Sequence, residues 1–201
     1  IVKDKLYTQQ ILAANNFPVP RTMLARYPLN IELIEKTLGF PIVVKTISGS
    51  QGSGVFLCEN KTHLEDLMQL IDTAKTQANF IIQEFIKTSK GRDLRVFIVG
   101  GIAIACMERI SSDGSFKANF SRGGEVREFP MNKEIEWLAT ESSRVLNLDI
   151  AGIDLLFDGE NFKVCEANSS PGFKGIESCC NISIPDAIFD YIKIRLGLYL
   201  S

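Results

Sequence analysis

Two apolar-rich segments separated by a short polar turn constrain the fold of this chain more than any other feature. The segments are residues 150–157 and 162–167. The sequence Asp-Gly-Glu-Asn between them has the residue types found where a chain reverses its direction. This pattern predicts an antiparallel hairpin.

Two carboxylates and an amide lie on this expected hairpin. Side chains of a strand alternate between faces, so a loop with an odd number of residues, such as 159–161, places Asp154 directly opposite Glu166. Asn168 then follows two positions further along. Facing carboxylates repel unless a cation lies between them, and oxygen ligands of this kind suit Mg²⁺ or Mn²⁺ better than zinc. Taken alone, a solvent-facing strand pair with incidental charges explains these residues slightly better.

The composition is that of a globular chain in a reducing compartment. The 201 residues are 45% hydrophobic, which is ample for one large domain or two small ones. A formal net charge of −2 excludes a global basic field for nucleic acid or an anionic membrane surface. Five cysteines without CxxC spacing and a single histidine argue against a zinc site and a disulfide framework, so we expect a cytoplasmic protein. No apolar run approaches the length of a membrane span.

Helices alternate with short strands along the rest of the chain, which predicts an α+β fold. Thr62 and Glu65 have the spacing of a capping box at the start of a helix. Gly100 and Gly101 predict the turn of a second hairpin. Helices are expected near residues 3–15, 30–38, 62–75, 133–146 and 185–196, and further strands near residues 22–25, 41–45, 55–58, 80–86, 93–99 and 102–108.

A glycine-rich segment, residues 48–54, connects two expected strands. Its spacing matches neither a dinucleotide-binding fingerprint nor a P-loop. Glycines nevertheless let backbone N–H groups approach phosphate oxygens, so Gly52 and Ser53 are candidate nucleotide contacts. Lys45, at the end of the preceding strand, is placed to add a positive charge. Lys45 is explained about as well as a residue without function that lies where a buried strand ends and the chain reaches the surface.

The segment 80–86 has a polar pair near its end that would be costly to bury without partners. An adenine needs hydrogen-bonding groups at one edge and apolar contact on its faces. Candidates for both are Gln83, Glu84, the backbone of Phe85, and Ile86. An ordinary edge strand is the favoured alternative when the segment is considered alone.

Cations are concentrated in the central third of the chain, although the overall charge is slightly negative. The charged residues there are Arg92, Asp93, Arg95, Arg109, Lys117 and Arg122. Guanidinium groups match carboxylate and phosphate oxygens in a bidentate geometry, so Arg109 and Arg122 are candidate clamps for phosphates or for an acidic substrate. Solvated surface arginines are commoner, and spacing alone leaves that reading open for Arg92.

Taken together, these segments follow an order that resembles a known superfamily. The motifs are PIVVK, GSQGSGV, IIQEFI, GRDLRVFIVGG, KANFSRGG, AGIDLL and VCEANSSPGFKGIE. They resemble the ATP-grasp superfamily and, within it, the RimK-like amino-acid ligases that add glutamate to a carboxyl terminus. The resemblance extends over residues 4–196. Each motif is loose, but their joint order and spacing are specific.

The resemblance implies an ATP-grasp fold, in which two α+β lobes with mainly antiparallel sheets enclose the nucleotide. We expect an entry helix and linker in residues 1–20, a smaller lobe with the glycine-rich loop in residues 21–87, and a larger lobe with the metal site in residues 88–201. Members of this family normally carry an additional N-terminal α/β domain. This chain begins at the expected entry helix, so it is expected either to be a fragment or to lack that domain.

The resemblance also implies roles for individual residues. Lys45 is expected to bind phosphates, and Asp93 the ribose. Glu84 and Phe85 are expected at the adenine, and Arg122 near a reacting acyl phosphate. Lys117 and Asn119 match further nucleotide contacts, and Asp154, Glu166 and Asn168 match metal ligands.

The implied function is that of an ATP-dependent ligase forming C–N bonds. A carboxylate takes the γ-phosphoryl group of ATP, and an amino group attacks the resulting acyl phosphate. The expected cofactors are ATP and two Mg²⁺ or Mn²⁺ ions, and the expected partners are a carboxylate or acidic substrate and an amino acid, glutamate in the first place. A ligase for another amino acid on a carrier protein or metabolite, a non-catalytic ATP-binding module, and a homo-oligomer all stay open.

Overall fold

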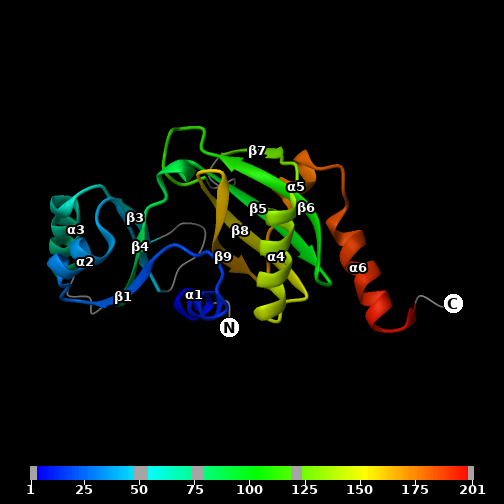
Figure 1. Ribbon diagram of the computed structural model, residues 1–201. Coiled ribbons are helices and arrows are strands. Elements are labelled where there is room, and N and C mark those ends of the chain that lie inside the picture. Colours follow the sequence, from blue (N-terminus) through cyan, green and yellow to red (C-terminus); the bar gives the residue numbers. More distant parts are fainter. Residues whose placement is uncertain (1–3, 48–53, 74–78, 119–123, 199–201) are drawn as a thin grey trace.

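Two antiparallel sheets with helices packed on them make up the chain, as the computed structural model shows (Figure 1). The structure describes residues 4–47, 54–73, 79–118 and 124–198. The predicted α+β class is confirmed. None of the helices in the described ranges is long and apolar enough to cross a membrane.

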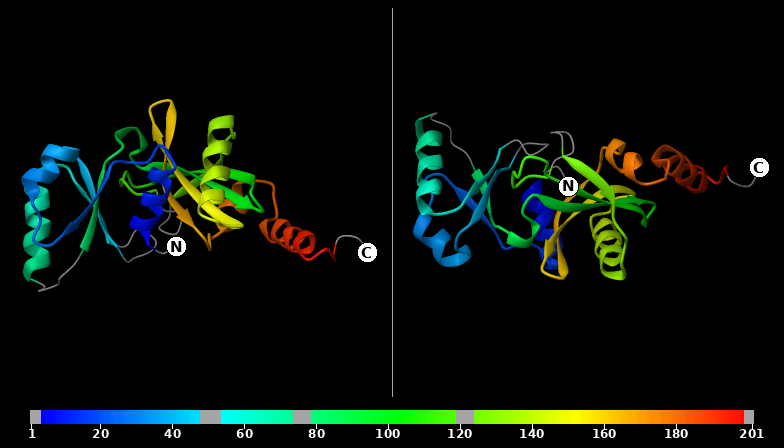
Figure 2. Two further views of the ribbon diagram at one scale, coloured as in Figure 1. Left: turned by 60° about the horizontal axis from the view of Figure 1, so that its bottom comes forward. Right: turned by 90° about the horizontal axis from the view of Figure 1, so that it is seen from above.

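The smaller sheet has four strands in the order β1-β4-β2-β3. Its strands are β1 (Thr22–Arg26), β2 (Ile42–Thr46), β3 (Val55–Cys58) and β4 (Asn79–Glu84), and its helices are α2 (Ile31–Leu38) and α3 (Lys61–Thr73). Ile34 of α2 and Leu64 of α3 are buried against Ile42 and Val44 of β2. Both helices therefore cover the same face of the sheet, and the other face stays open to the second sheet (Figure 2).

Polar residues at the helix ends explain where α2 and α3 begin. Asn30 accepts a hydrogen bond from the Leu33 amide at 3.0 Å, as an N-cap does. For α3 the predicted capping box is wrong, because Asn60 caps this helix by accepting from the His63 amide at 2.9 Å. Thr62 instead lies inside the first turn.

The larger sheet has five strands in the order β7-β6-β5-β8-β9. Its strands are β5 (Arg92–Val99), β6 (Ile102–Ile110), β7 (Glu125–Glu128), β8 (Ile150–Asp158) and β9 (Asn161–Asn168). The other elements are α1 (Lys5–Ala14), the 3₁₀ turn η1 (Lys87–Ser89), α4 (Lys133–Val145), α5 (Lys174–Cys179) and α6 (Ile184–Arg195). Helix α4 packs on one face, whereas α5 and α6 lie by the other (Figure 1).

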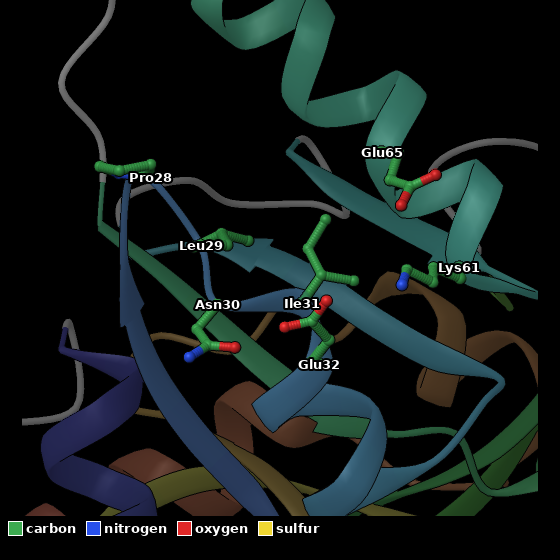
Figure 3. Close-up of a pocket in the computed structure, with 7 residues that line it drawn as sticks. All are labelled: Pro28, Leu29, Asn30, Ile31, Glu32, Lys61 and Glu65. Carbon is green, nitrogen blue, oxygen red and sulfur yellow. The ribbon is translucent and has the colours of Figure 1, made fainter.

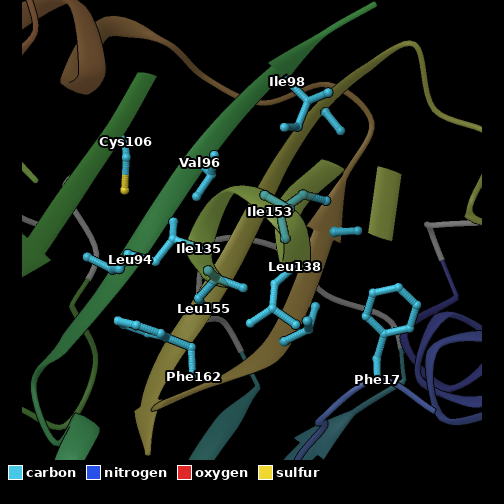
Figure 4. Packing of buried hydrophobic residues seen from close by; sticks show 14 of the residues in the cluster. Phe17, Leu94, Val96, Ile98, Cys106, Ile135, Leu138, Ile153, Leu155 and Phe162 are labelled. Atoms are coloured by element: carbon cyan, nitrogen blue, oxygen red, sulfur yellow. The ribbon is translucent and has the colours of Figure 1, made fainter. Parts of the chain in front are cut away.

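A large apolar core fills the space between α4 and the larger sheet (Figure 4). Ile135 and Leu138 of α4 are buried against Leu94, Val96 and Ile153 of the central strands. Alternate residues of β5 and β8 contribute to this core, as strand geometry requires. The side chains between them project to the opposite face, which carries Asp93, Arg95 and Asp154.

The entry segment packs on the larger sheet, although it precedes the smaller one in sequence. Leu12 of α1 is fully buried in the larger core. The Phe17 ring stacks on Trp137 of α4 with centroids 5.6 Å apart. Pro18 extends the sheet at its edge, since its carbonyl accepts from the Val164 amide at 2.8 Å.

The β8–β9 hairpin places Asp154 opposite Glu166, as predicted, but by a different route. The turn holds two residues, an even number, between the paired Asp158 and Asn161. A two-residue turn alone would set Cys165 opposite Asp154. The register shifts by one residue next to Asp154, so Cys165 is left without a partner on β8. The predicted odd loop is therefore wrong, and a β-bulge supplies the extra residue instead.

The β5–β6 hairpin repeats this arrangement. Gly100 and Gly101 form its turn with φ of 61° and 81°, values that favour glycine. The register then shifts near Phe97, and Asp93 ends directly opposite Arg109. Without this bulge, Asp93 would face Glu108.

Candidate active site

A cleft of about 1210 Å³ lies between the uncovered face of the smaller sheet and the face of the larger sheet opposite α4; Figure 2 shows how the two sheets are arranged. Alternate residues of the smaller sheet line one side: Val43, Lys45, Val55, Ile81 and Gln83. Alternate and bulged positions of the larger sheet line the other side: Asp93, Arg95, Arg109, Asp154, Cys165, Glu166 and Asn168. The strand periodicity of both sheets thus directs polar side chains into one space.

Most of the candidate residues from the sequence meet in this cleft. Those that line it are Lys45, Gln83, Glu84, Phe85, Ile86, Asp93, Arg109, Lys117, Asp154, Glu166 and Asn168. Gly52, Ser53, Asn119 and Arg122 lie outside the described residues. The sequence gives no role to Gln9, and the apolar run around Cys165 predicts a small core residue, whereas Cys165 lines the cleft. Arg95 was also left without a role, although a strand residue two positions from Asp93 lies on the same face.

Lys45 is held at the floor of the cleft by a buried amide. Its Nζ donates to Oε1 of Gln83 at 2.7 Å, and Nε2 of Gln83 donates to the Thr22 hydroxyl at 2.9 Å. Gln83 is 3% exposed, so this pair satisfies a side chain that would otherwise be costly to bury. The ammonium group is thereby fixed at the cleft wall.

The residue that ends the glycine-rich segment has to be a glycine. Gly54 has a φ of 69°, and a Cβ there would collide with the Thr46 side chain. The Gly54 carbonyl also accepts from the Thr46 amide at 2.9 Å. The chain therefore returns tightly to β2, next to Lys45.

Glu84 joins the two sheets by ion pairs. Its Oε2 accepts from Arg21 Nε at 2.8 Å, and its Oε1 accepts from Lys163 Nζ of β9, also at 2.8 Å. Burial raises the pKa of Glu84, but the hydrogen bonds from Lys163 and Arg21 outweigh this effect and lower the pKa to about 2. Since both oxygens are engaged, the carboxylate serves the link between the sheets, and an adenine contact by Glu84 stays a prediction.

Replacing Glu84 by Gln is expected to destabilise the fold in a pH-dependent way. The folded pKa lies below the ordinary value of 4.5, so the stabilisation is fully present above pH 4.5 and is lost as the pH falls toward 2. We expect E84Q to lower the free energy of unfolding by about 2 kcal/mol at pH 7 and by less at pH 3, measured with urea. The exposed Glu59 provides the control variant E59Q. A difference that is equal at both pH values would contradict this assignment.

Four charged side chains form a row of alternating sign on the larger sheet. Arg109 donates through Nε and Nη2 to the two oxygens of Asp93, at 2.6 and 2.8 Å. Arg95 binds Asp154 in the same bidentate way, with both distances 2.7 Å. Nη2 of Arg109 also reaches Oδ2 of Asp154 at 2.9 Å and so links the two pairs. Arg109 is thus engaged by carboxylates rather than free as a clamp.

The row sets the protonation of its carboxylates. Burial raises the pKa of Asp154, but Arg109 and Arg95 outweigh it and hold this pKa below its ordinary value. Burial raises the pKa of Asp93 to about 6, against the effect of Arg109. Asp154 is therefore an anion at neutral pH, as a metal ligand has to be.

The donor set at the end of the hairpin fits a hard cation. A carboxylate has about four lone-pair sites, and arginines occupy one on Oδ1 and two on Oδ2 of Asp154, so one site on Oδ1 remains. The side-chain amide of Asn168 can bind a cation through its oxygen, and its nitrogen is buried without a hydrogen-bond partner among the described residues. Within those residues no salt bridge engages Glu166.

A donor set for a metal ion at this place would include Asn168. In the described ranges, no group of three or more His, Cys, Asp or Glu side chains is arranged to hold a metal ion. Asp154 and Glu166 supply only two carboxylates, and the amide of Asn168 adds the third oxygen. Carboxylate and amide oxygens suit Mg²⁺.

Aromatic and aliphatic side chains line the part of the cleft beside η1. Phe85 and Phe116 contact each other edge to face, with centroids 6.4 Å apart. Ile86 and Leu156 border the same cleft. Lys117 Nζ lies 5.3 Å from the centroid of the Phe116 ring, a cation–π distance. This wall offers apolar contact for a planar base next to a positive charge.

A second hollow lies at the N-terminal ends of α2 and α3, away from these residues (Figure 3). It is open, has a volume of about 460 Å³, and is bordered by Glu32, Lys61 and Glu65 among others. None of the candidate residues from the sequence lies there. The cleft between the sheets is thus the place where the predicted chemistry converges.

Known proteins share this architecture. Residues 2–192 match the RimK-like ATP-grasp domain. A probable alpha-L-glutamate ligase of Vibrio parahaemolyticus is 37% identical over 192 residues, which are 95% of this chain and 63% of that relative. The chain therefore spans less than two thirds of the length of this relative.

Two solved structures show the same fold at low sequence identity. A RimK domain ATP-grasp protein from Sphaerobacter thermophilus has a TM-score of 0.77 and 17% identity over 94% of this chain and 67% of its own. The ATP-grasp ligase PsnB, complexed with a phosphomimetic variant of a minimal precursor, Mg and ADP, has a TM-score of 0.72 and 20% identity over 95% of this chain and 59% of its own. The predicted ATP-grasp fold is confirmed, and the chain belongs to the family of RimK-like ATP-grasp domains.

Proposed function

We propose that this chain is the catalytic core of an ATP-dependent carboxylate–amine ligase that adds glutamate to a protein or small-molecule carboxylate. One observation carries the proposal: the cleft sets the Lys45 ammonium on one sheet against the oxygen donors Asp154, Glu166 and Asn168 on the other. A cation and a metal-binding donor set on opposite walls are what a nucleoside triphosphate requires. A 37% identical relative carries the name alpha-L-glutamate ligase, which favours glutamate.

Charge along the cleft supports an anionic ligand. The lining residues Arg95, Arg109 and Glu84 are neutralised by ion pairs within the protein. Lys45 is bound to a neutral amide, and Lys174 is an exposed cation at the cleft wall. Lys45 and Lys174 are thus cations of the cleft that are not offset by these ion pairs, and they favour phosphates and a substrate carboxylate.

In the proposed reaction, Phe85 and Ile86 flank the base, and Lys45 binds phosphate oxygens of ATP. An oxygen of the substrate carboxylate attacks the γ-phosphorus, ADP leaves, and an acyl phosphate forms. The amine of glutamate, as the free base, then attacks the acyl carbon, and inorganic phosphate leaves as the C–N bond forms. We assign Arg122 to the charge that develops at this carbon. Arg109 orients Asp93 and Asp154 through the ion pairs described above.

Asp154, Glu166 and Asn168 would hold two Mg²⁺ or Mn²⁺ ions, whose charge neutralises the phosphate oxygens during transfer. Glu166 would be free to offer more acceptor sites than Asp154, because arginines leave only one lone-pair site on Asp154. Asp93 retains lone pairs beside Arg109, and we assign it to the ribose hydroxyls. The five cysteines are free thiols, which supports a reducing, cytoplasmic setting for this reaction.

Calorimetry of ATP binding tests this proposal. We expect the chain to bind ATP with magnesium present, and K45M to weaken binding about 10-fold because one phosphate contact is lost. The exposed Lys90 provides the control variant K90M, which should bind like the wild type. Absence of magnesium-dependent binding at millimolar ATP would refute the ligase proposal. A screen for ADP release with glutamate and other amino acids then identifies the amine substrate.

A further inference from the structure

The β-bulge of β9 is what brings the proposed metal ligands to the cleft. Val164 lies in the core, so strict alternation would direct Cys165 to the cleft and Glu166 back to the core. The extra residue instead lets Cys165 and Glu166, which are consecutive, both line the cleft. Ala167 and Asn168 then follow with the shifted alternation, since Ala167 is buried in the core. Any residue that maintains the bulge therefore acts on the metal site.

Helix α1 supplies such a residue. Nε2 of Gln9 donates a hydrogen bond of 2.7 Å to the carbonyl oxygen of Cys165. A bulge disrupts the ladder, and Cys165 has no paired residue on β8. The side chain of Gln9 thus provides a donor to the bulged residue from a helix more than 150 positions away in sequence.

The orientation of the Gln9 amide follows from its partner. A carbonyl oxygen can only accept, so the NH₂ group has to face Cys165. Oε1 of Gln9 is then buried and, among the described residues, has no partner. Gln9 is only 6% exposed, although it borders the cleft. Burial of this amide is costly, and the hydrogen bond to Cys165 offsets part of that cost.

Helix α1 is itself firmly placed on the larger sheet. Asp4 caps the helix by accepting from the amides of Leu6 and Tyr7, at 2.9 and 3.0 Å. Leu12, three residues after Gln9, is fully buried in the core. Gln9 therefore reaches β9 from a rigid support rather than from a mobile side chain on the surface.

We propose that Gln9 is a positioning residue that fixes the bulge at Cys165 and thereby the geometry of Glu166 and Asn168 as metal ligands. This inference rests on the proposed metal site. Residues that orient metal ligands without binding the metal commonly change metal affinity 10- to 100-fold when replaced. Loss of the donor should loosen the bulge and weaken metal binding. Lys45 should be affected less, because Gln83 holds its Nζ at 2.7 Å, whereas the Sγ of Cys165 lies 3.9 Å from it.

The test compares Q9M with Q10M. Met has a similar size to Gln but no donor, and Gln10 is an exposed neighbour on the same helix. With a non-hydrolysable ATP analogue bound, we expect Q9M to raise the Mn²⁺ dissociation constant about 10-fold, measured by calorimetry and by electron paramagnetic resonance. Q10M should match the wild type. Q9E, which presents only acceptors to the Cys165 carbonyl, should show at least the same loss.

Two readouts separate positioning from a general loss of structure. In Q9M, metal-free binding of the ATP analogue should weaken far less than Mn²⁺ binding, because Gln83 still holds Lys45. Excess Mg²⁺ should restore ADP formation in Q9M, because the defect lies in metal affinity. Equal Mn²⁺ affinity in Q9M and the wild type, or a loss that excess metal does not restore, would overturn the inference. A wild type that binds no metal would instead refute the proposed function.

Discussion

Replacing Glu166 by Gln is expected to reduce magnesium-dependent ADP formation at least 100-fold while leaving the fold intact. Glu166 lines the cleft directly opposite Asp154, and no salt bridge engages it among the described residues. The substitution removes one negative charge but keeps the shape of the side chain. Loss of a charged ligand from a site with only two carboxylates weakens metal binding severely.

The hairpin that carries Glu166 also provides its control. Glu160 lies in the exposed turn of the same hairpin, so E160Q makes the same chemical change away from the cleft. We expect E160Q to retain wild-type ADP formation and E166Q to unfold at the wild-type midpoint. Full activity in E166Q would contradict the metal assignment.

Replacing Asp154 by Ala is expected to destabilise the protein by roughly 3–5 kcal/mol, in addition to abolishing ADP formation. Asp154 is 5% exposed and accepts three hydrogen bonds from Arg95 and Arg109. Arg95 and Arg109 both bind this carboxylate, so its removal takes one partner from each guanidinium group. Arg109 is also buried, so water cannot compensate fully.

Urea unfolding at neutral pH measures this difference. The control is D190A, because Asp190 is half exposed and pairs with Lys193 on the surface of α6. Such exposed pairs contribute about 0–1 kcal/mol, so D190A should unfold close to the wild type. If D154A and D190A were equally stable, the ion pairs of Asp154 would not hold the sheet together as described. A loss of activity in D154A alone therefore cannot identify a metal ligand, whereas E166Q can.

The sequence was informative for several local features, although the capping box at Thr62 and the odd-numbered loop of the β8–β9 hairpin were wrong. Asn30 and Gly39 bound α2, and Gly100-Gly101 closes a hairpin, because capping and turn geometry depend on a few neighbouring residues. The candidate residues of the cleft were found mainly through the order of the motifs. Their common location in one cleft is a consequence of strand alternation in two sheets.

The remaining features depend on contacts between distant segments. A bulge at Cys165 has no local signature, and its partner Gln9 belongs to another element. The pairing of Glu84 with Lys163 likewise joins two sheets that the sequence presents separately. Which carboxylates are engaged by arginines, and which stay available, was therefore not predictable from spacing.

The two bulged hairpins imply that turn length and strand length are interchangeable in this sheet. A two-residue turn with one bulged residue, and a three-residue turn with none, place the same side chains opposite one another. A related chain could thus carry the extra residue in the turn near Gly159 instead of in the bulge at Cys165. The same two carboxylates would still face each other. An alignment that kept the turn fixed would misplace the ligand pair by one position.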